Sequence, residues 1–302
     1  MIAARYDFAC RKTLCVKISA GFNLAFDSDG ETPLLLMIHI RPERHHDLIE
    51  PEKLTVYPEI PFTTYADSFG NICTRLIAPA GRLSIWNRFL IADSGNHEQL
   101  PFYDRQHSIG ELPNEVLVFL LGSRYCDTQK LSNLAWSLFG RYQEGWARVQ
   151  AILQYTHDRI QFSYPNARSD RTAWEAHEER SGVCRDFTHL AITLCRCMNI
   201  PARYCTGYLG DIGVPVDPNP MDFSAWLEVY LGGKWHSLDA RHNHPRIGRV
   251  PMAVGRDAVD AAISTAFGAA SLSEFAVFTD EVGPQRDREF IFRDASRTDI
   301  FR

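Results

Sequence analysis

The residue best placed to do chemistry is Cys184, which follows a glycine turn at the expected start of an apolar helix. Backbone N–H groups at a helix N-terminus lack intrahelical partners and form the positive end of the helix dipole. A thiolate is stabilised there, which lowers its pKa and makes it a nucleophile at neutral pH. The same N–H groups could bind the oxyanion of an acyl-transfer intermediate. As one of eight cysteines, Cys184 could equally be a small buried apolar residue.

A predicted hairpin follows this helix. Phe223–Leu231 and Lys234–Ala240 have the composition of strands, and Gly232-Gly233 between them suits a type I′ or II′ turn. A two-residue loop pairs Leu231 with Lys234, so the sequence fixes which residues lie opposite each other.

This register gathers polar residues on one sheet face. Ser224 faces Arg241, and Asp239 faces Trp226. Because strand side chains alternate, all four share a face, and Asp239 lies diagonal to Ser224 within side-chain reach. Trp226, Arg241 and the helix residue Asp186 could therefore line a cleft. A core position for Trp226, a solvated position for Arg241 and a capping or ion-pairing role for Asp186 explain them as well.

The histidines near this hairpin are candidates for a base. His236 is an odd number of residues from Asp239 and should point to the opposite face. His242 lies just past the strand end and could turn toward the site. His189 and His157 lie on predicted helices, where packing or hydrogen bonding in the core is the expected role.

Other motifs do not support a metal or phosphate site. His177–Ser181 begins like the zinc-protease HExxH but lacks the second histidine. Gly207–Gly213 has neither the GxGxxG spacing nor a following helix. His236, His242 and His244 are close in sequence, and a surface loop explains them better than a zinc site. We expect no metal and no cofactor.

Two regions of different periodicity position these residues. The first 125 residues show short β-rich runs, with a turn predicted at Asp67–Asn71 because Gly and Asn tolerate positive φ. From residue 131 onward, apolar residues recur at helical spacing in Glu144–Ile160 and Cys184–Met198. A strand at Ala202–Gly207 and a helix at Ala258–Ala270 are also expected. The β-rich runs of the first region are Leu34–Ile40, Leu54–Tyr57, Ile72–Ile77, Leu83–Phe89 and a run near Val116.

Composition excludes several functional classes. The 302 residues carry 32 Lys+Arg against 37 Asp+Glu, a net charge of −5 that argues against a nucleic-acid binder. The apolar runs are too short for a spanning helix, and Arg5 and Asp7 interrupt the region where a signal peptide needs apolar residues. We expect a cytoplasmic protein with mostly reduced thiols and no membrane partner. The charged segment Pro284–Arg302 is expected to be a poorly ordered tail.

Five segments in order resemble the transglutaminase-like superfamily, and more narrowly bacterial transglutaminase-like cysteine proteases with an N-terminal β domain. They are DSFGN at Asp67–Asn71, GVCRDFTHLAI at Gly182–Ile192, AWLEVYL at Ala225–Leu231, DARHNHPRIGR at Asp239–Arg249 and GRDAVD at Gly255–Asp260. The resemblance implies an α+β, papain-like core at 126–245, an all-β domain at 1–125 and a C-terminal extension at 246–302.

The same resemblance implies a Cys–His–Asp triad. The cysteine carries over to Cys184 and the aspartate to Asp239, but the histidine that precedes the Ala-Trp pair is Ser224 here. A serine hydroxyl cannot take up and return a proton near pH 7 as a histidine does. Two functions follow. The protein is an acyl-thioester enzyme acting on peptides or carboxamides, impaired at Ser224, or a non-catalytic relative that binds a peptide or protein. Alternatively, Ser224 is itself a substitution in an otherwise active protein.

Overall fold

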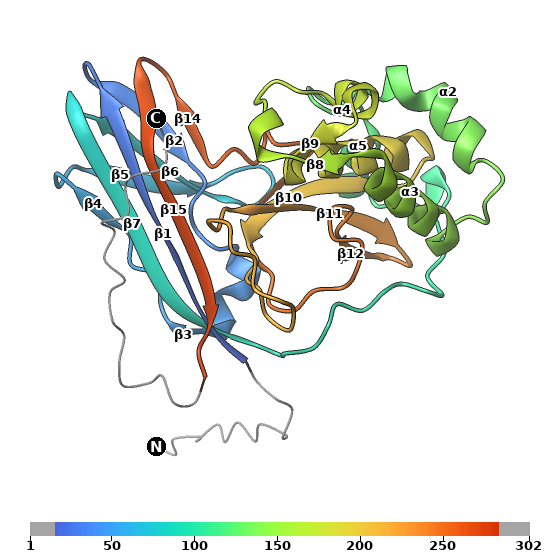
Figure 1. Cartoon of the computed structure of the whole chain (residues 1–302), viewed down its shortest axis with the longest axis horizontal. Helices are drawn as coiled ribbons and strands as arrows, with labels where there is room; N and C mark the ends of the chain where they lie inside the picture. The colour runs from blue at the N-terminus through green and yellow to red at the C-terminus, as the bar shows by residue number, and fades with distance from the viewer. Residues whose placement is uncertain (1–15, 284–302) are drawn as a thin grey trace.

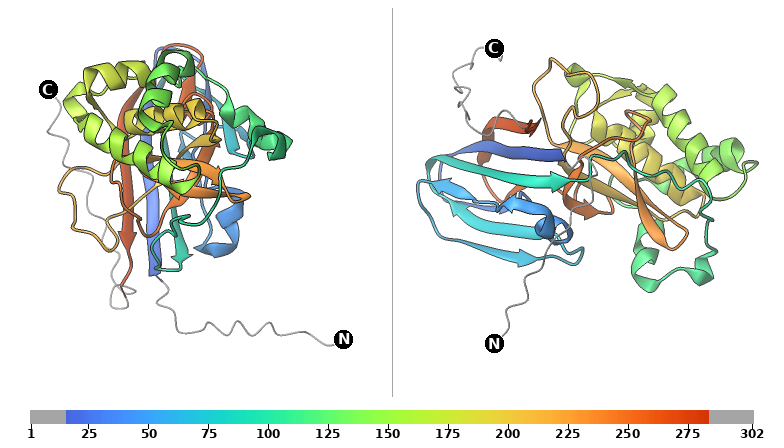
Figure 2. Two further views of the ribbon diagram at one scale, coloured as in Figure 1. Left: turned by 90° about the vertical axis from the view of Figure 1, so that its right-hand side faces the viewer. Right: turned by 90° about the horizontal axis from the view of Figure 1, so that it is seen from below.

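The computed structural model describes residues 16–283 and shows a β-rich part beside a part that contains all the long helices (Figure 1). The right panel of Figure 2 again shows the two parts side by side, and in its left panel the helical part lies in front of the β-rich part. This arrangement confirms the α+β class with an N-terminal strand-rich region. No helix in the described range is long and apolar enough to cross a membrane.

The β-rich part consists of two antiparallel sheets packed face to face. One has the order β15-β1-β7-β3 with β4 also paired to β7, and the other has the order β14-β2-β6-β5. Side chains of both sheets, such as Phe22, Leu36 and Ile85, form one fully buried cluster between them. The strands are β1 (Val16–Ser28), β2 (Thr32–Leu36), β3 (Leu48–Glu50), β4 (Thr55–Tyr57), β5 (Phe62–Ala66), β6 (Ile72–Ala78), β7 (Gly81–Asp93), β14 (Ser264–Ala266) and β15 (Ala270–Glu281).

The helical part contains a four-stranded antiparallel sheet in the order β12-β11-β10-β13. Helix α5 packs against its β10 and β11 strands, and the other three helices of this part pack around α5 (Figure 1). Its elements are α2 (Thr128–Phe139), α3 (Trp146–Arg159), α4 (Ala173–Glu179), α5 (Cys184–Cys197), β10 (Ala202–Tyr208), β11 (Ser224–Leu231), β12 (Lys234–Leu238) and β13 (Val250–Gly255). Shorter elements are β8 (Gln161–Phe162), β9 (Ser181–Gly182), α1 (Asn114–Leu117) and the 3-10 turns η1 (Pro42–Asp47), η2 (Ile109–Glu111), η3 (Val118–Leu120) and η4 (Tyr164–Asn166).

The predicted hairpin is confirmed. Leu231 pairs with Lys234 and Leu227 with Leu238, and both glycines of the turn have positive φ. Strand β12 ends at Leu238, two residues earlier than expected, so Asp239 begins the turn that follows it.

Residues after 245 are divided between both parts. Strand β13 joins the helical part's sheet, whereas β14 and β15 join the two N-terminal sheets. The turn at Asp67–Asn71 connects the parts, because the Asn71 side chain donates to the Val254 carbonyl (2.7 Å) and accepts the Val254 N–H (2.8 Å). The domain boundaries at 125 and 245 stay predictions.

Two expected elements are wrong. The alanine-rich segment 258–270 does not form a helix, because Ser264–Ala266 pair with β2 and this tertiary contact overrides helix propensity. The apolar run near Val116 is not a strand but α1 followed by a 3-10 turn, since Phe119 packs on Phe69 and Trp235. The predicted tail, Pro284–Arg302, lies outside the described residues.

Candidate active site

Cys184 is the first residue of α5 and is positioned by the segment before it. Strand β9 pairs in parallel with β8 and leads directly into the helix. Gly182 is required there, because a Cβ atom on it would lie 2.6 Å from the Asp186 carboxylate. The helix start is therefore fixed by close packing as well as by hydrogen bonds.

Asp186 is part of this helix start and does not line a cleft. Its Oδ2 accepts the Val183 N–H (2.8 Å) and an N–H of Arg171 (3.0 Å). The side chain is fully buried. Asp186 thus caps α5, which was one of the two roles considered for it.

The surroundings of Cys184 favour the neutral thiol in this state. Burial raises the pKa of Cys184 to about 11, and the negative charges of Asp222 and Asp239 add to the effect. The Arg241 guanidinium and the Ala225 backbone N–H, which points at the thiol, oppose this shift. The expectation of a lowered pKa is therefore wrong for the resting site, and the thiol needs a base to become a nucleophile.

Asp239 is a buried carboxylate with all its acceptor positions in use. Oδ1 accepts the backbone N–H groups of Arg241 and His242, both at 2.9 Å. Oδ2 accepts from His242 Nδ1 and Arg249 Nη2, both at 2.8 Å. Burial alone would raise its pKa, but Arg249 and His242 hold the pKa of Asp239 well below its usual range. Asp239 is therefore ionised at every physiological pH.

The partner that the structure gives to Asp239 is His242. The imidazole lies in the turn directly after β12 and donates through Nδ1, while its Nε2 has no hydrogen-bond partner among residues 16–283. The sequence analysis gave His242 only as an alternative base, because the strand before it was expected to continue to Ala240. The early end of β12 allows the turn that brings the ring back onto Asp239.

Arg249 completes a chain of charges behind this pair. It bonds Glu98 Oε1 (2.5 Å) as well as Asp239, and its guanidinium lies 4.9 Å from the centre of the Trp226 ring. Trp226 is 1% exposed and packs with Cys205 and Val254, so it is a core residue that supports Arg249 rather than a wall of a cleft.

The charge of Arg241 acts on the thiol of Cys184. The predicted pairing of Ser224 with Arg241 and of Trp226 with Asp239 is not part of the hairpin, because β12 ends at Leu238. The Arg241 guanidinium stacks on the Phe162 ring at 3.8 Å, and the Arg241 backbone carbonyl binds His157 Nδ1 at 2.9 Å. Ser224 is the first residue of β11, lies opposite Gly207 of β10 and remains partly exposed. Its backbone carbonyl accepts from Thr206 Oγ1 at 3.0 Å.

Three residues near Cys184 were missed by sequence reasoning. Burial of the Asp222 carboxyl raises its pKa to about 6, although the residue as a whole is exposed. Tyr204 is buried against His189, and burial raises the pKa of its phenol well above the usual value. Burial also raises the pKa of the Tyr164 phenol, and the charges of Asp222 and Cys184 add to that shift. Only Asp222 had a sequence signal, its position two residues before Ser224.

Two other histidines considered from the sequence have partners of their own. His236 contacts Asp104 (2.9 Å) on the far side of the hairpin, as parity predicted. His189 is buried between Tyr125 and Tyr204, and burial holds its pKa well below the usual value. In the described range no three His, Cys, Asp or Glu side chains come together as metal ligands.

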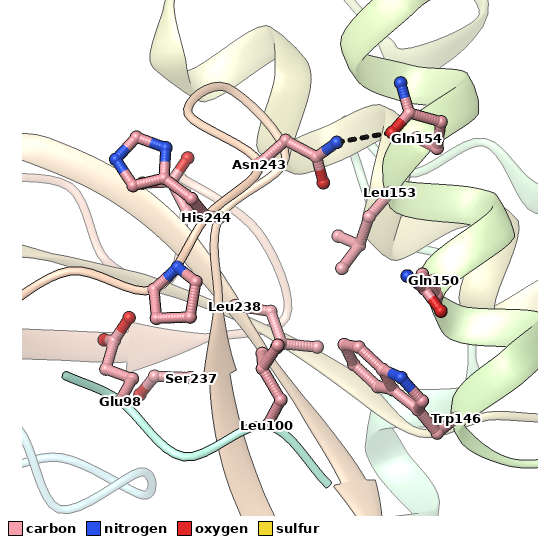
Figure 3. A pocket seen from close by; sticks show the side chains of 12 residues that line it. Glu98, Leu100, Trp146, Gln150, Leu153, Gln154, Ser237, Leu238, Asn243 and His244 are labelled. Atoms are coloured by element: carbon pink, nitrogen blue, oxygen red, sulfur yellow. Dashed lines mark hydrogen bonds between the residues drawn. The ribbon is translucent and has the colours of Figure 1, made fainter. Parts of the chain in front are cut away.

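A pocket of about 150 Å³ lies behind Asp239, between β12, α3 and the turn at 239–245. Figure 3 shows Trp146 and Leu153 of α3 on one side, Glu98 on the other, and Asn243 bonded to Gln154 across its rim. Cys184 is not among its lining residues. The pocket therefore borders Asp239 but not the thiol of Cys184.

Comparison with known proteins agrees with this geometry. Residues 133–240, which contain Cys184, Ser224 and Asp239, match the family model of the transglutaminase-like superfamily. This segment is a transglutaminase-like domain.

A crystal structure described as "a Putative Cysteine Protease from Cytophaga hutchinsonii" is similar over 89% of this chain and 91% of its own, with 29% identity and a TM-score of 0.77. An uncharacterised protein of Mycobacterium leprae is 32% identical over 119 residues, which are 38% of this chain. The match spans only 42% of that relative's length. Most of the chain, with its N-terminal β part, thus shares its fold with the structure described as a putative cysteine protease.

Proposed function

We propose that the protein is a transglutaminase-like cysteine hydrolase or acyltransferase that acts on a peptide or carboxamide. Cys184 attacks the carbonyl carbon, the amine leaves, and the resulting thioester passes its acyl group to water or to a second amine. The observation that carries this proposal is the position of the thiol. It lies at the start of α5 with the Ala225 N–H directed at it and the ionised Asp239 nearby.

The backbone geometry supports the acyl chemistry. The N–H groups of Asp186 and Phe187 donate to the Val183 carbonyl, whereas those of Cys184 and Arg185 come before these first bonds of α5. The Cys184 and Arg185 N–H groups are the ones that we expect to face the carbonyl oxygen as it becomes negative during attack. The Arg241 cation adds positive potential at the same place. In this proposal these groups stabilise the oxyanion.

The test is a panel of peptide and glutamine-amide substrates, offered with and without a primary amine. We expect product formation by the native protein and none by Cys184→Ala. Cys197→Ala is the matched control, because Cys197 is the last residue of α5 and lies at the opposite end of the helix from Cys184. Mass spectrometry of the quenched reaction should find the acyl group on Cys184. Equal turnover by Cys184→Ala would contradict the proposal.

A non-catalytic, peptide-binding protein is the second candidate. The raised pKa of Cys184 favours it, since an idle thiol has no need of activation. A protein of this kind would bind a peptide equally well with or without the thiol and would form no acyl adduct.

We also propose a cytoplasmic location. The six cysteines within residues 16–283 are all free thiols, which suits a reducing compartment. Fractionation of source cells with a periplasmic and a cytoplasmic marker tests the location, and recovery with the periplasmic marker would contradict it.

A further inference from the structure

We propose that His242 is the general base of this site, so that the triad is Cys184–His242–Asp239 and the base has moved from strand β11 to the turn after β12. The inference rests on the proposed function and names the residue that acts as base in place of a histidine at position 224. It explains how the site can transfer protons although Ser224 cannot.

The orientation of the His242 ring is the first support. Nδ1 donates to Asp239 Oδ2 at 2.8 Å, and the His242 backbone N–H donates to the same carboxylate at 2.9 Å. The turn is closed by the Asn243 N–H, which donates to the Asp239 carbonyl at 2.8 Å. A proton held on Nδ1 leaves Nε2 as the acceptor, which is the tautomer that a triad base needs.

The position of the turn is the second support. Arg241, the residue before His242, acts on the charge of Cys184, and so does Asp239. Arg241 also stacks on the Phe162 ring, and Phe162 pairs with Gly182, two residues before Cys184. The turn therefore lies beside the start of α5, and the His242 side chain is 24% exposed. On the other side, hydrogen bonds from Asn219 and, to a smaller extent, the charges of Arg241 and His242 lower the pKa of Asp217 in the loop between β10 and β11.

The filled acceptor positions of Asp239 are the third support. A carboxylate offers about four lone-pair sites, and four donors already occupy them. A histidine at position 224 would have to displace His242 to be oriented by Asp239. Asp239 therefore orients the His242 ring and has no free acceptor position for a side chain at position 224.

The proton balance of the reaction is complete with this base. His242 Nε2 takes the Sγ proton as the sulfur bonds to the carbonyl carbon, and the imidazolium returns it to the amine as the C–N bond breaks. Water then gives a proton to Nε2 as its oxygen attacks the thioester. The C–S bond breaks, and the thiol recovers that proton. Asp239 remains a carboxylate throughout and stabilises the imidazolium.

Asp222 is the rival base, since its charge acts on the thiol more strongly than that of Asp239. Burial raises the pKa of its carboxyl to about 6, but no side chain among residues 16–283 is hydrogen-bonded to it, whereas Asp239 orients His242. The negative charge of Asp222 also disfavours the thiolate. We therefore assign Asp222 an electrostatic effect on Cys184 and no proton transfer.

The charged and titratable groups around His242 come from three places: behind its ring, on its own turn and on the facing loop. They are Asp239 and Arg249 behind the ring, Arg241 and His244 on the same turn, and Asp217 on the facing loop. His244 is the natural control, because it is exposed on the same turn and bonds only the His242 carbonyl, at 2.8 Å.

The experiment compares full-length native protein with His242→Ala, His244→Ala and Asp222→Asn. We measure kcat/KM on the best substrate of the panel and the rate of Cys184 alkylation by iodoacetamide between pH 5 and 9. His242→Ala should lose about 10²–10⁴-fold in kcat/KM, the usual contribution of a positioned acid–base. Its alkylation rate should lose the inflection that a histidine partner gives the native profile. His244→Ala should match the native protein in both assays.

A rescue variant separates a base from a structural residue. Ser224→His combined with His242→Ala places a histidine where Asp239 has become available, and turnover should return. Full turnover by His242→Ala, or its loss in Asp222→Asn alone, would overturn the inference. If the native protein turns over no substrate, the proposed function fails, and an alkylation profile unchanged in His242→Ala then overturns the role of His242 as well.

Discussion

Replacement of Asp239 by asparagine should destabilise the fold as well as the site. The side chain is 3% exposed and holds the buried Arg249 cation, His242 and two backbone N–H groups. Removal of one partner of a buried ion pair costs about 3–5 kcal/mol, because the other charge is left uncompensated. Arg249 keeps its 2.5 Å contact with Glu98, so we expect the lower end, about 3 kcal/mol.

Urea unfolding followed by tryptophan fluorescence measures this change. The free energy of unfolding of Asp239→Asn should fall by that amount, and the double variant Asp239→Asn/Arg249→Met should lose less than the two single changes together. Glu274→Gln is the control, because Glu274 and its partner Arg82 form an exposed pair whose loss should not be measurable. A loss below about 1 kcal/mol in Asp239→Asn would refute the reasoning, since it would mean that the carboxylate carries little of the buried charge balance.

Three further outcomes follow from the same contacts. Stability should fall as the pH drops below about 4, because the depressed pKa of Asp239 contributes stability that is complete above the unfolded-state value and lost on protonation; the difference in urea midpoint between native protein and Asp239→Asn should shrink at pH 3, and a constant difference would contradict this. Asp222→Asn removes a negative charge that helps raise the pKa of Cys184, so alkylation at pH 8 should become a few-fold faster, whereas an unchanged or slower rate would show that Asp222 does not act on the thiol. Gly182→Ala would place a Cβ 2.6 Å from Asp186 and should cost about 1–3 kcal/mol in thermal or urea unfolding, and native-like stability would show that the helix start can shift.

The hairpin and the position of Cys184 at a helix start could be predicted from sequence because both depend on local rules. A two-residue glycine turn fixes strand register, and this correctly placed Leu227 opposite Leu238. A glycine turn before an apolar helix likewise placed Cys184 at the start of α5.

The pairing of His242 with Asp239 could not be predicted in the same way. It depends on β12 ending at Leu238, and strand ends are set by contacts with other parts of the chain. The raised pKa of Cys184 was missed for a related reason. A helix start by itself favours the thiolate, but Asp222 and the burial of the sulfur come from the fold around it.

Long-range strand pairing explains the parts of the fold that the sequence analysis missed, namely β1, β15 and the strand within 258–270. Strands β1 and β15 lie at opposite ends of the described chain, yet they are neighbours in one sheet, with β15 at its edge, and pair over most of their length (Figure 1). Pairing at this separation leaves no local pattern. The alanine-rich segment at 258–270 had a local helical preference that the pairing of Ser264–Ala266 with β2 overrode.

The most direct test of the central claim is the rate at which Cys184 is acylated by an activated ester, measured by site-resolved mass spectrometry at pH 7. The account predicts an acyl group on Cys184 in the native protein and a rate at least tenfold lower in His242→Ala, as expected when a base is lost. Acylation at another residue, or equal rates in the two proteins, would contradict the assignment of Cys184 and His242 as nucleophile and base.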